Sequence, residues 1–221
     1  MGSEMCIRDS FDDAAIAVLV AMVLDGLDGR IARMTNTSSE FGAEYDSMSD
    51  MVSFGVAPSL IMYEWSLGNI ARQGFGQVGW VVAFLFAACA ALRLARFNVQ
   101  IGSVDKKFFI GLASPAAAAL IVCTVWVFHD SGFTGSQMTI LSLVVTTVGA
   151  LLMVSNFKYY SFKEFGANHR VPFFMLLGLV FIFMFTSLDP PKVLFAGFVL
   201  YAFSGPVFEA WRWKQRKDKQ R

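Results

Sequence analysis

The chain has 221 residues, of which 56% are hydrophobic and only 16% are charged, and its mean hydropathy is +0.55. Soluble domains contain about 25% charged residues, so this balance excludes a soluble protein and predicts an integral membrane protein. The formal net charge at pH 7 is only +1, and we expect no nucleic-acid partner.

Seven apolar runs follow one another along the chain and predict its helices. Most of them approach the ~20 residues that a helix needs to cross the hydrocarbon core of a bilayer. Short loops join them, so no residues are left for a second soluble domain. We therefore expect an all-α fold, a polytopic transmembrane bundle of about seven helices that span Phe11–Leu24, Met48–Leu67, Gly79–Leu94, Phe108–Phe128, Met138–Val154, Pro172–Leu188 and Val193–Trp211.

The two ends of the chain differ from this pattern. Residues 1–10, MGSEMCIRDS, are polar and give way abruptly to membrane sequence at Phe11. We interpret them as a non-native tag or assembly scar and leave them out of the fold prediction. Residues 11–211 form the predicted membrane domain, and residues 212–221 form a basic tail that favours anionic lipid headgroups.

Lys and Arg residues gather on one side of the predicted bundle. If the loop after Leu24 is cytoplasmic, that side receives most of them, whereas the other side receives only Arg8, Arg72 and Lys192. Cytoplasmic loops near helix ends collect basic residues. We therefore predict a multi-pass protein of the inner, cytoplasmic membrane, with the segment after Leu24 and the C-terminal tail facing the cytoplasm.

The first cytoplasmic segment, LDGLDGRIARMTNTSSEFGAEYDSMSD at residues 24–50, contains four aspartates. An α-helix advances about 100° per residue. This places Asp25 and Asp28 on one face of the first helix, and Asp46 and Asp50 on one face of the next. Two adjacent antiparallel helices can thus present four carboxylates to one small volume. That volume needs a cation, because unneutralised carboxylates repel one another.

Divalent ions are the candidate cations. Mg²⁺ and Mn²⁺ prefer oxygen ligands and commonly bridge protein carboxylates to substrate phosphates, and a pair of such ions suits phosphoryl transfer. Gly29 and Gly42 leave space beside the acidic faces, and Arg33 adds a planar donor fork suited to phosphate oxygens. Together these residues describe a cradle for a diphosphate.

Two other interpretations of the acidic segment remain open. In the first, the helices simply pack against each other there, and the aspartates reach water near the headgroups. In the second, the chain is a cation or proton transporter that uses intramembrane aspartates. A transporter has no need for Gly29, Arg33 and Gly42 at fixed offsets, which favours the diphosphate cradle.

The spacing of eight residues resembles a known signature, D-x2-D-G-x2-A-R-x8-G-x3-D-x3-D, which is that of the CDP-alcohol phosphotransferases. The residues that carry it are Asp25, Asp28, Gly29, Ala32, Arg33, Gly42, Asp46 and Asp50. The stretches EFGAEYDSMSDMVSFGVAPSL and AALRLARFN further resemble the bacterial branch of this family that uses serine as the acceptor alcohol. The resemblance extends from Phe11 to about Asn98, and the later helices match mainly in hydropathy.

The resemblance implies a transfer of the phosphatidyl group from CDP-diacylglycerol, held in the lipid bilayer, to the hydroxyl of L-serine, with release of CMP. It implies that two ions of Mg²⁺ or Mn²⁺ are held by Asp25, Asp28, Asp46 and Asp50. It implies further that Asp50 is the general base, and that the CDP group is bound by Asp25, Gly29, Arg33 and Gly42. A homodimer is left open.

The acceptor site is the least defined part of this prediction. The serine carboxylate needs a cation, and Arg93 and Arg96 are candidates, although the positive-inside rule explains them equally well. Another acceptor, glycerol 3-phosphate or inositol phosphate, stays open, because the choice of serine rests on the resemblance. The family has a further membrane helix before the motif. We expect that this chain lacks that helix and that restoring the upstream sequence raises activity.

Overall fold

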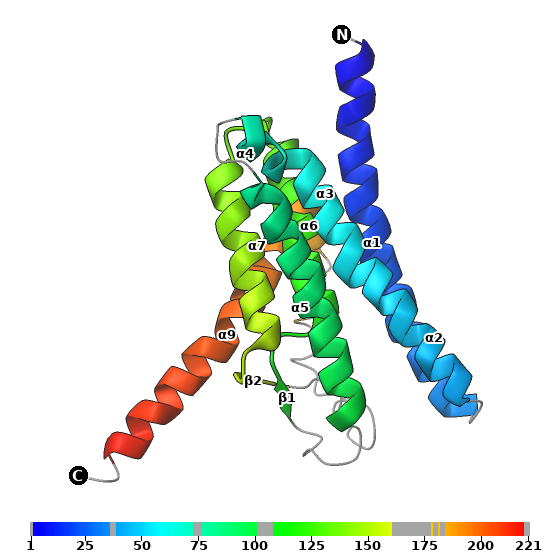
Figure 1. Cartoon of the computed structure of the whole chain (residues 1–221), viewed down its shortest axis with the longest axis vertical. Helices are drawn as coiled ribbons and strands as arrows, with labels where there is room; N and C mark the ends of the chain where they lie inside the picture. The colour runs from blue at the N-terminus through cyan, green and yellow to red at the C-terminus, as the bar shows by residue number, and fades with distance from the viewer. Residues whose placement is uncertain are drawn as a thin grey trace.

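The structure, a computed structural model, describes residues 2–35, 39–72, 77–100, 108–160, 178, 181 and 184–218. Helices make up nearly all of this part of the chain, as Figure 1 shows. Within the described ranges the exception is a two-stranded antiparallel ribbon, β1 (Phe108–Ile110) with β2 (Lys158–Tyr160), in which Phe109 pairs with Tyr159. The helical fold is as predicted, and the ribbon is not.

Helix α1 (Gly2–Thr35) is one unbroken helix that includes the first apolar run and the first half of the acidic segment. It starts at Gly2, so the segment that we interpret as a scar is helical, and its origin stays a prediction. Near its start, Asp12 pairs with His129 at the end of α6, with 3.0 Å between Oδ1 and Nδ1. This pair fixes one end of α1 to the rest of the bundle.

Helix α2 (Glu40–Met51) begins after Ser39, whose Oγ accepts a hydrogen bond of 3.0 Å from the backbone N–H of Gly42. A serine in this position satisfies an N–H group that the first helical turn leaves free. The helical path then continues through two π-helical segments. Its parts are η1 (Val52–Val56), α3 (Ala57–Met62), η2 (Tyr63–Leu67) and the short α4 (Asn69–Arg72).

The core of the molecule surrounds α6 (Ser114–Asp130), which packs against α1, α3, α7 and α9. The helix opens with the small residues SPAAAA, and Ala116 to Val125 are all buried. Small side chains allow neighbouring helices of a membrane protein to approach closely. Helices α5 (Val78–Gln100) and α7 (Thr139–Val154) pack against each other beside it and complete this core.

The apolar run Phe108–Phe128 was predicted as one helix, and this prediction is wrong at its start. The run opens with strand β1, and the helix begins only at Ser114. Gly111 has a φ of 81°, which glycine adopts at little cost and which interrupts a right-handed helix. Pro115 then lies in the first turn of α6, where its missing N–H leaves no helical bond unmade.

The last helix, α9 (Pro190–Asp218), leaves the bundle at an angle and ends near the C-terminus (Figure 1). It is attached to the ribbon through Tyr159, which is fully buried and donates its hydroxyl to the Ala202 carbonyl oxygen at 3.0 Å. The predicted helix Pro172–Leu188 lies mostly outside the described residues. The predicted run Val193–Trp211 falls within α9.

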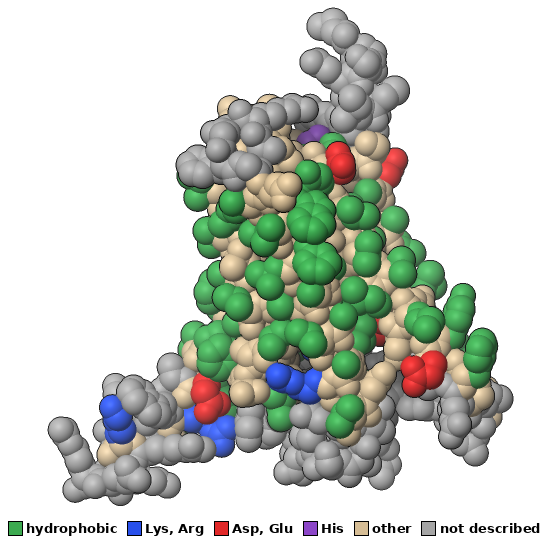
Figure 2. All heavy atoms as spheres, viewed as in Figure 1, with side chains coloured by type: hydrophobic (Ala, Val, Ile, Leu, Met, Phe, Trp, Pro, Cys, Tyr) green, Lys and Arg blue, Asp and Glu red, His purple; other side chains and the backbone are tan. Residues whose placement is uncertain are grey.

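The middle of the bundle presents large apolar side chains to its surroundings, among them Trp80, Phe84, Ile140 and Val144 on α5 and α7. Figure 2 shows this apolar band, with charged side chains gathered towards its two ends. Among the described helices, the two stretches long and apolar enough to cross a bilayer are Val78–Val99 and Pro190–Glu209. An apolar belt between polar ends is the surface that a bilayer core accommodates.

Candidate functional site

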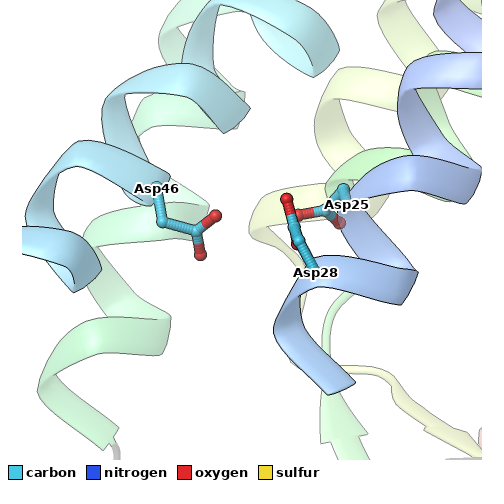
Figure 3. A group of neighbouring side chains, drawn as sticks. All are labelled: Asp25, Asp28 and Asp46. Atoms are coloured by element: carbon cyan, nitrogen blue, oxygen red, sulfur yellow. The ribbon is translucent and has the colours of Figure 1, made fainter. Parts of the chain in front are cut away.

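Three of the four predicted aspartates meet at the end of the molecule opposite the Asp12–His129 pair. Asp25 and Asp28 extend from α1, and Asp46 extends from α2 towards them, as Figure 3 shows. One carboxylate oxygen from each lies within 4.8 Å of the other two. Asp28 and Asp46 are exposed and Asp25 is half-buried. The cluster is therefore accessible from outside the bundle.

Asp50 adjoins this cluster from one helical turn beyond Asp46. Its carboxyl group is an electrostatic neighbour of the carboxyl groups of Asp25 and Asp46. Asp50 is also half-buried. The structure therefore brings together all four aspartates that the spacing places on facing helices.

The electrostatics of the cluster favour a bound cation. Burial raises the pKa of Asp25 above its ordinary value, and the charges of Asp46 and Asp28 raise it further. The pKa of Asp46 is also raised, first by burial and then by the charge of Asp28. A metal ion between these carboxylates would remove the repulsion, and it would replace protons in doing so.

The residues present fit Mg²⁺ or Mn²⁺. Both ions take carboxylate oxygens as ligands, and Mg²⁺ is usually held by a few carboxylates together with water and substrate phosphates. Carboxylates from only two helices leave room for such further ligands. Among the residues that the structure describes, Asp25, Asp28 and Asp46 are the group whose oxygens converge in this way.

The glycines beside the cluster lie in open space. A Cβ atom added to Gly26 or Gly29 would meet no other atom within 4 Å. Glycine inside a helix costs about 1 kcal/mol relative to alanine, and no protein neighbour in this region requires it. Gly42 is different, because its Cβ would lie 3.1 Å from Ser39 Oγ. Arg33 belongs to α1, and its side chain lies outside the described part of the structure.

Arg93 lies on α5 close to the aspartates but makes no ion pair with a carboxylate of the described residues. Its Nη1 donates a hydrogen bond of 2.6 Å to Ser114 Oγ, while its buried Nε has no hydrogen-bond partner. Asp50 and Tyr201 are its electrostatic neighbours. A half-buried guanidinium whose direct bond goes to a neutral hydroxyl can still bind an anion.

Arg96, the second predicted serine ligand, has other contacts. Its Nη1 donates to the Asn156 side-chain oxygen at 3.3 Å and lies 3.5 Å from the Ser155 carbonyl oxygen. These bonds connect the end of α5 to the residues that follow α7. On the same turn of α5, Asn98 donates to Ser47 Oγ of α2 at 3.1 Å.

Ser114 and Tyr201 were not predicted as site residues. Ser114 begins α6 and is almost fully buried, and only the serine-proline pair at that position indicates a helix start. Tyr201 belongs to a long apolar run in which nothing distinguishes it from residues that face lipid. Both come near Arg93 only through the tertiary packing of α5, α6 and α9.

Comparison with known proteins places this sequence in a family. The sequence profile of the CDP-alcohol phosphatidyltransferase family matches residues 5–154. This range includes both helices that carry the aspartates, as well as Arg93 and Ser114. Helix α9, with Tyr201, lies beyond it.

Individual relatives extend the similarity over most of the chain. A CDP-diacylglycerol–serine O-phosphatidyltransferase of Helicobacter pylori strain J99 is 39% identical over 191 residues, which are 86% of this chain and 78% of the relative. The protein of the same name from strain 26695 is 41% identical over 167 residues, 76% of this chain and 68% of its own length. Another from Methanocaldococcus jannaschii is 41% identical over 142 residues, 64% and 61% of the two chains.

Proposed function

Because the chain belongs to the CDP-alcohol phosphatidyltransferase family, we propose that it transfers the phosphatidyl group of CDP-diacylglycerol to L-serine and releases CMP. The relatives that match most of its length carry the name of this serine-dependent activity. The observation that carries the proposal is the convergence of Asp25, Asp28 and Asp46 from two facing helices. The product is phosphatidylserine, so the chain is a transferase of phospholipid synthesis.

Asp25, Asp28, Asp46 and Asp50 would hold two divalent ions, Mg²⁺ or Mn²⁺. When bound, these ions would supply positive charge for the donor's diphosphate and for the charge that develops on the departing CMP. Gly29 lies in open space beside this position, which permits the nucleotide to approach the backbone of α1. Asp25, Gly29, Arg33 and Gly42 line the CDP group.

Asp50 is the general base. It lies at the inner edge of the cluster beside Asp25, where a hydroxyl approaching the diphosphate would come within its reach. The carboxylate accepts the proton of the serine hydroxyl while the serine oxygen forms a bond to the lipid-bearing phosphorus. The bond from that phosphorus to the oxygen of CMP breaks.

Arg93 is the stronger of the two candidates for the serine carboxylate. Its guanidinium lies near Asp50 and keeps an unused, buried donor at Nε, whereas the guanidinium of Arg96 already contacts Ser155 and Asn156. An Arg side chain forms strong, directional bonds to a carboxylate. Serine bound to Arg93 would extend its hydroxyl towards Asp50.

The aspartate end of the bundle faces the cytoplasm of a multi-pass membrane protein. The basic residues that collect there support this orientation. The fatty chains of the donor then stay in the bilayer beside the exposed apolar residues of α1, α2 and η1, which include Leu24, Leu27, Met48 and Val52. L-serine arrives from the aqueous side.

An assay of CMP release tests this function directly. Purified protein is given CDP-diacylglycerol, L-serine and Mg²⁺ or Mn²⁺, and we expect CMP and phosphatidylserine in equal amounts. Chelation of the metal by EDTA should stop the reaction, and added Mn²⁺ should restore it. Turnover with glycerol 3-phosphate or inositol phosphate, and none with serine, would show that the acceptor is not serine. A protein that releases no CMP with any acceptor would contradict the enzyme.

A further inference from the structure

Arg93 is a half-buried cation that pairs with no anion among the described residues. No carboxylate of those residues lies within ion-pair distance of it, and its direct bond goes to the neutral hydroxyl of Ser114 at 2.6 Å. Its Nε is buried and without a partner. A charge that is partly removed from water is costly unless it is paired, so Arg93 can take up one negatively charged group.

Tyr201 of α9 lies near Arg93. It is half-buried and is an electrostatic neighbour of Arg93. Within the described part of the chain its hydroxyl makes no hydrogen bond, and so it can act as a donor. The position therefore offers the Nε of Arg93 and the hydroxyl of Tyr201, two donors that no other described group uses.

The position of Tyr201 is held by the ribbon. The ring of Tyr201 rests against that of Tyr159, with 5.6 Å between their centroids, and the hydroxyl of Tyr159 binds the carbonyl oxygen of the next residue, Ala202. Gly205 lies one turn further along α9, and a Cβ there would lie 2.4 Å from the Tyr159 ring. The glycine thus lets α9 come close enough for Tyr201 to reach the neighbourhood of Arg93.

We propose that Tyr201 forms, with Arg93 and Ser114, the subsite that binds the acceptor's carboxylate, and that this subsite determines acceptor specificity. The inference rests on the proposed function. One guanidinium and a neutral hydroxyl balance the single charge of a carboxylate and not the double charge of a phosphate monoester. The family profile ends at residue 154, so Tyr201 lies outside the part that defines the whole family.

The test compares L-serine with serinamide, which keeps the reactive hydroxyl and lacks the carboxylate. We expect the wild-type protein to prefer serine strongly in kcat/KM. In Tyr201→Phe one hydrogen bond to the carboxylate is lost, so this preference should fall about tenfold, because a bond to a charged group contributes about 1.5 kcal/mol or more. The KM for CDP-diacylglycerol should not change.

Two further variants separate binding from structural support. Ser114→Ala removes the bond that orients Arg93 and should also lower the preference for serine over serinamide. Tyr63→Phe makes the same chemical change on η2, at the opposite end of the bundle, and should leave the preference as it is in the wild type. Thermal unfolding of each variant shows whether it is folded.

The outcomes distinguish a failure of the carboxylate subsite from a failure of the proposed transferase function. Serine turnover with an unchanged preference in both Tyr201→Phe and Ser114→Ala overturns the subsite and leaves the proposed function intact. A wild-type protein that turns over serine and serinamide equally well also overturns the subsite. A wild-type protein that releases no CMP from CDP-diacylglycerol and serine overturns both.

Discussion

Asp25 and Asp50 are 25 positions apart in the chain, yet their carboxyl groups are electrostatic neighbours. The proximity follows from helical periodicity, since residues three or four apart lie on one face and two such faces meet between α1 and α2. The role of each aspartate then depends on its burial. Asp28 and Asp46 are exposed, whereas Asp50 lies deeper and beside the place where the acceptor would arrive.

Asp50→Asn keeps the size of the side chain and removes its ability to accept a proton. We expect turnover to fall by at least about 100-fold, the usual contribution of a general base, while binding of CDP-diacylglycerol weakens less. The matched control is Asp13→Asn in α1, about 18 Å along the helix from Asp25. This variant should be as active as the wild type. Normal turnover by Asp50→Asn would show that the base is another group.

Gly29→Ala separates stability from function. The added methyl group meets no protein atom and improves helix propensity, so unfolding should require up to about 1 kcal/mol more. The affinity for CDP should nevertheless fall about tenfold if the nucleotide occupies the open space. Gly26→Ala is the control, with the same gain in stability and unchanged CDP affinity. Calorimetric titration with CDP and Mn²⁺ measures the CDP affinity of both variants. Equal affinities would show that the nucleotide does not occupy the space beside Gly29.

The sequence predicts the proposed donor half of the site more completely than the proposed acceptor half, of which it names Arg93 and not Ser114 or Tyr201. The four aspartates follow a local spacing that a helical wheel interprets directly. Arg93, Ser114 and Tyr201 come from three helices and are brought together by packing alone, so no local pattern joins them. Arg96 illustrates the difference, because the same positive-inside rule selects it and the structure gives it separate contacts.

Among the elements, α9 depends on a ribbon that the hydropathy pattern does not predict. The apolar runs predict α7 to within a residue and fall inside the longer helices α5 and α9, because a long apolar stretch has few alternatives in a bilayer. They do not predict where a helix changes to π geometry, as in η1 and η2, or where a run begins with a strand. In the run Phe108–Phe128, Gly111 at positive φ separates the strand from the helix.

The junction of α9 with the ribbon can be tested by two substitutions. Tyr159→Phe removes the bond to the Ala202 carbonyl oxygen and should lower the free energy of unfolding by about 1 kcal/mol. Gly205→Ala places a methyl group 2.4 Å from the Tyr159 ring and should cost about 1–3 kcal/mol. Gly197→Ala, where a Cβ would meet nothing, is the control on the same helix. Equal stabilities of Gly205→Ala and Gly197→Ala would contradict this packing.

The whole molecule is polarised along its long axis. One end carries the four aspartates and Arg93, and the other carries the Asp12–His129 pair and the loop between α6 and α7. Apolar side chains cover the region between them (Figure 2). The orientation in the membrane is predicted from the distribution of basic residues alone, and it stays a prediction. Because the two ends of the bundle are far apart, labelling at each end can test it.

Cysteine labelling in intact cells determines this orientation. In a background without the native cysteines, Ser136→Cys lies in the exposed loop before α7 and Gln215→Cys near the exposed end of α9. We expect a membrane-impermeant maleimide to label position 136 in intact cells and position 215 only after the membrane is opened. The opposite pattern would place the aspartates outside and leave them without access to cytoplasmic serine.

The long helix α1 connects the two ends of the bundle. From the contact of Asp12 with His129, at 1.5 Å per residue, Asp25 lies about 20 Å further along the axis. A tilt of about 5° around that contact would displace the Asp25 carboxylate by roughly 2 Å, and a misplacement of about 1 Å can already slow a reaction 100-fold. The packing of α1 against α6, α3 and η1 therefore matters for the position of the aspartates.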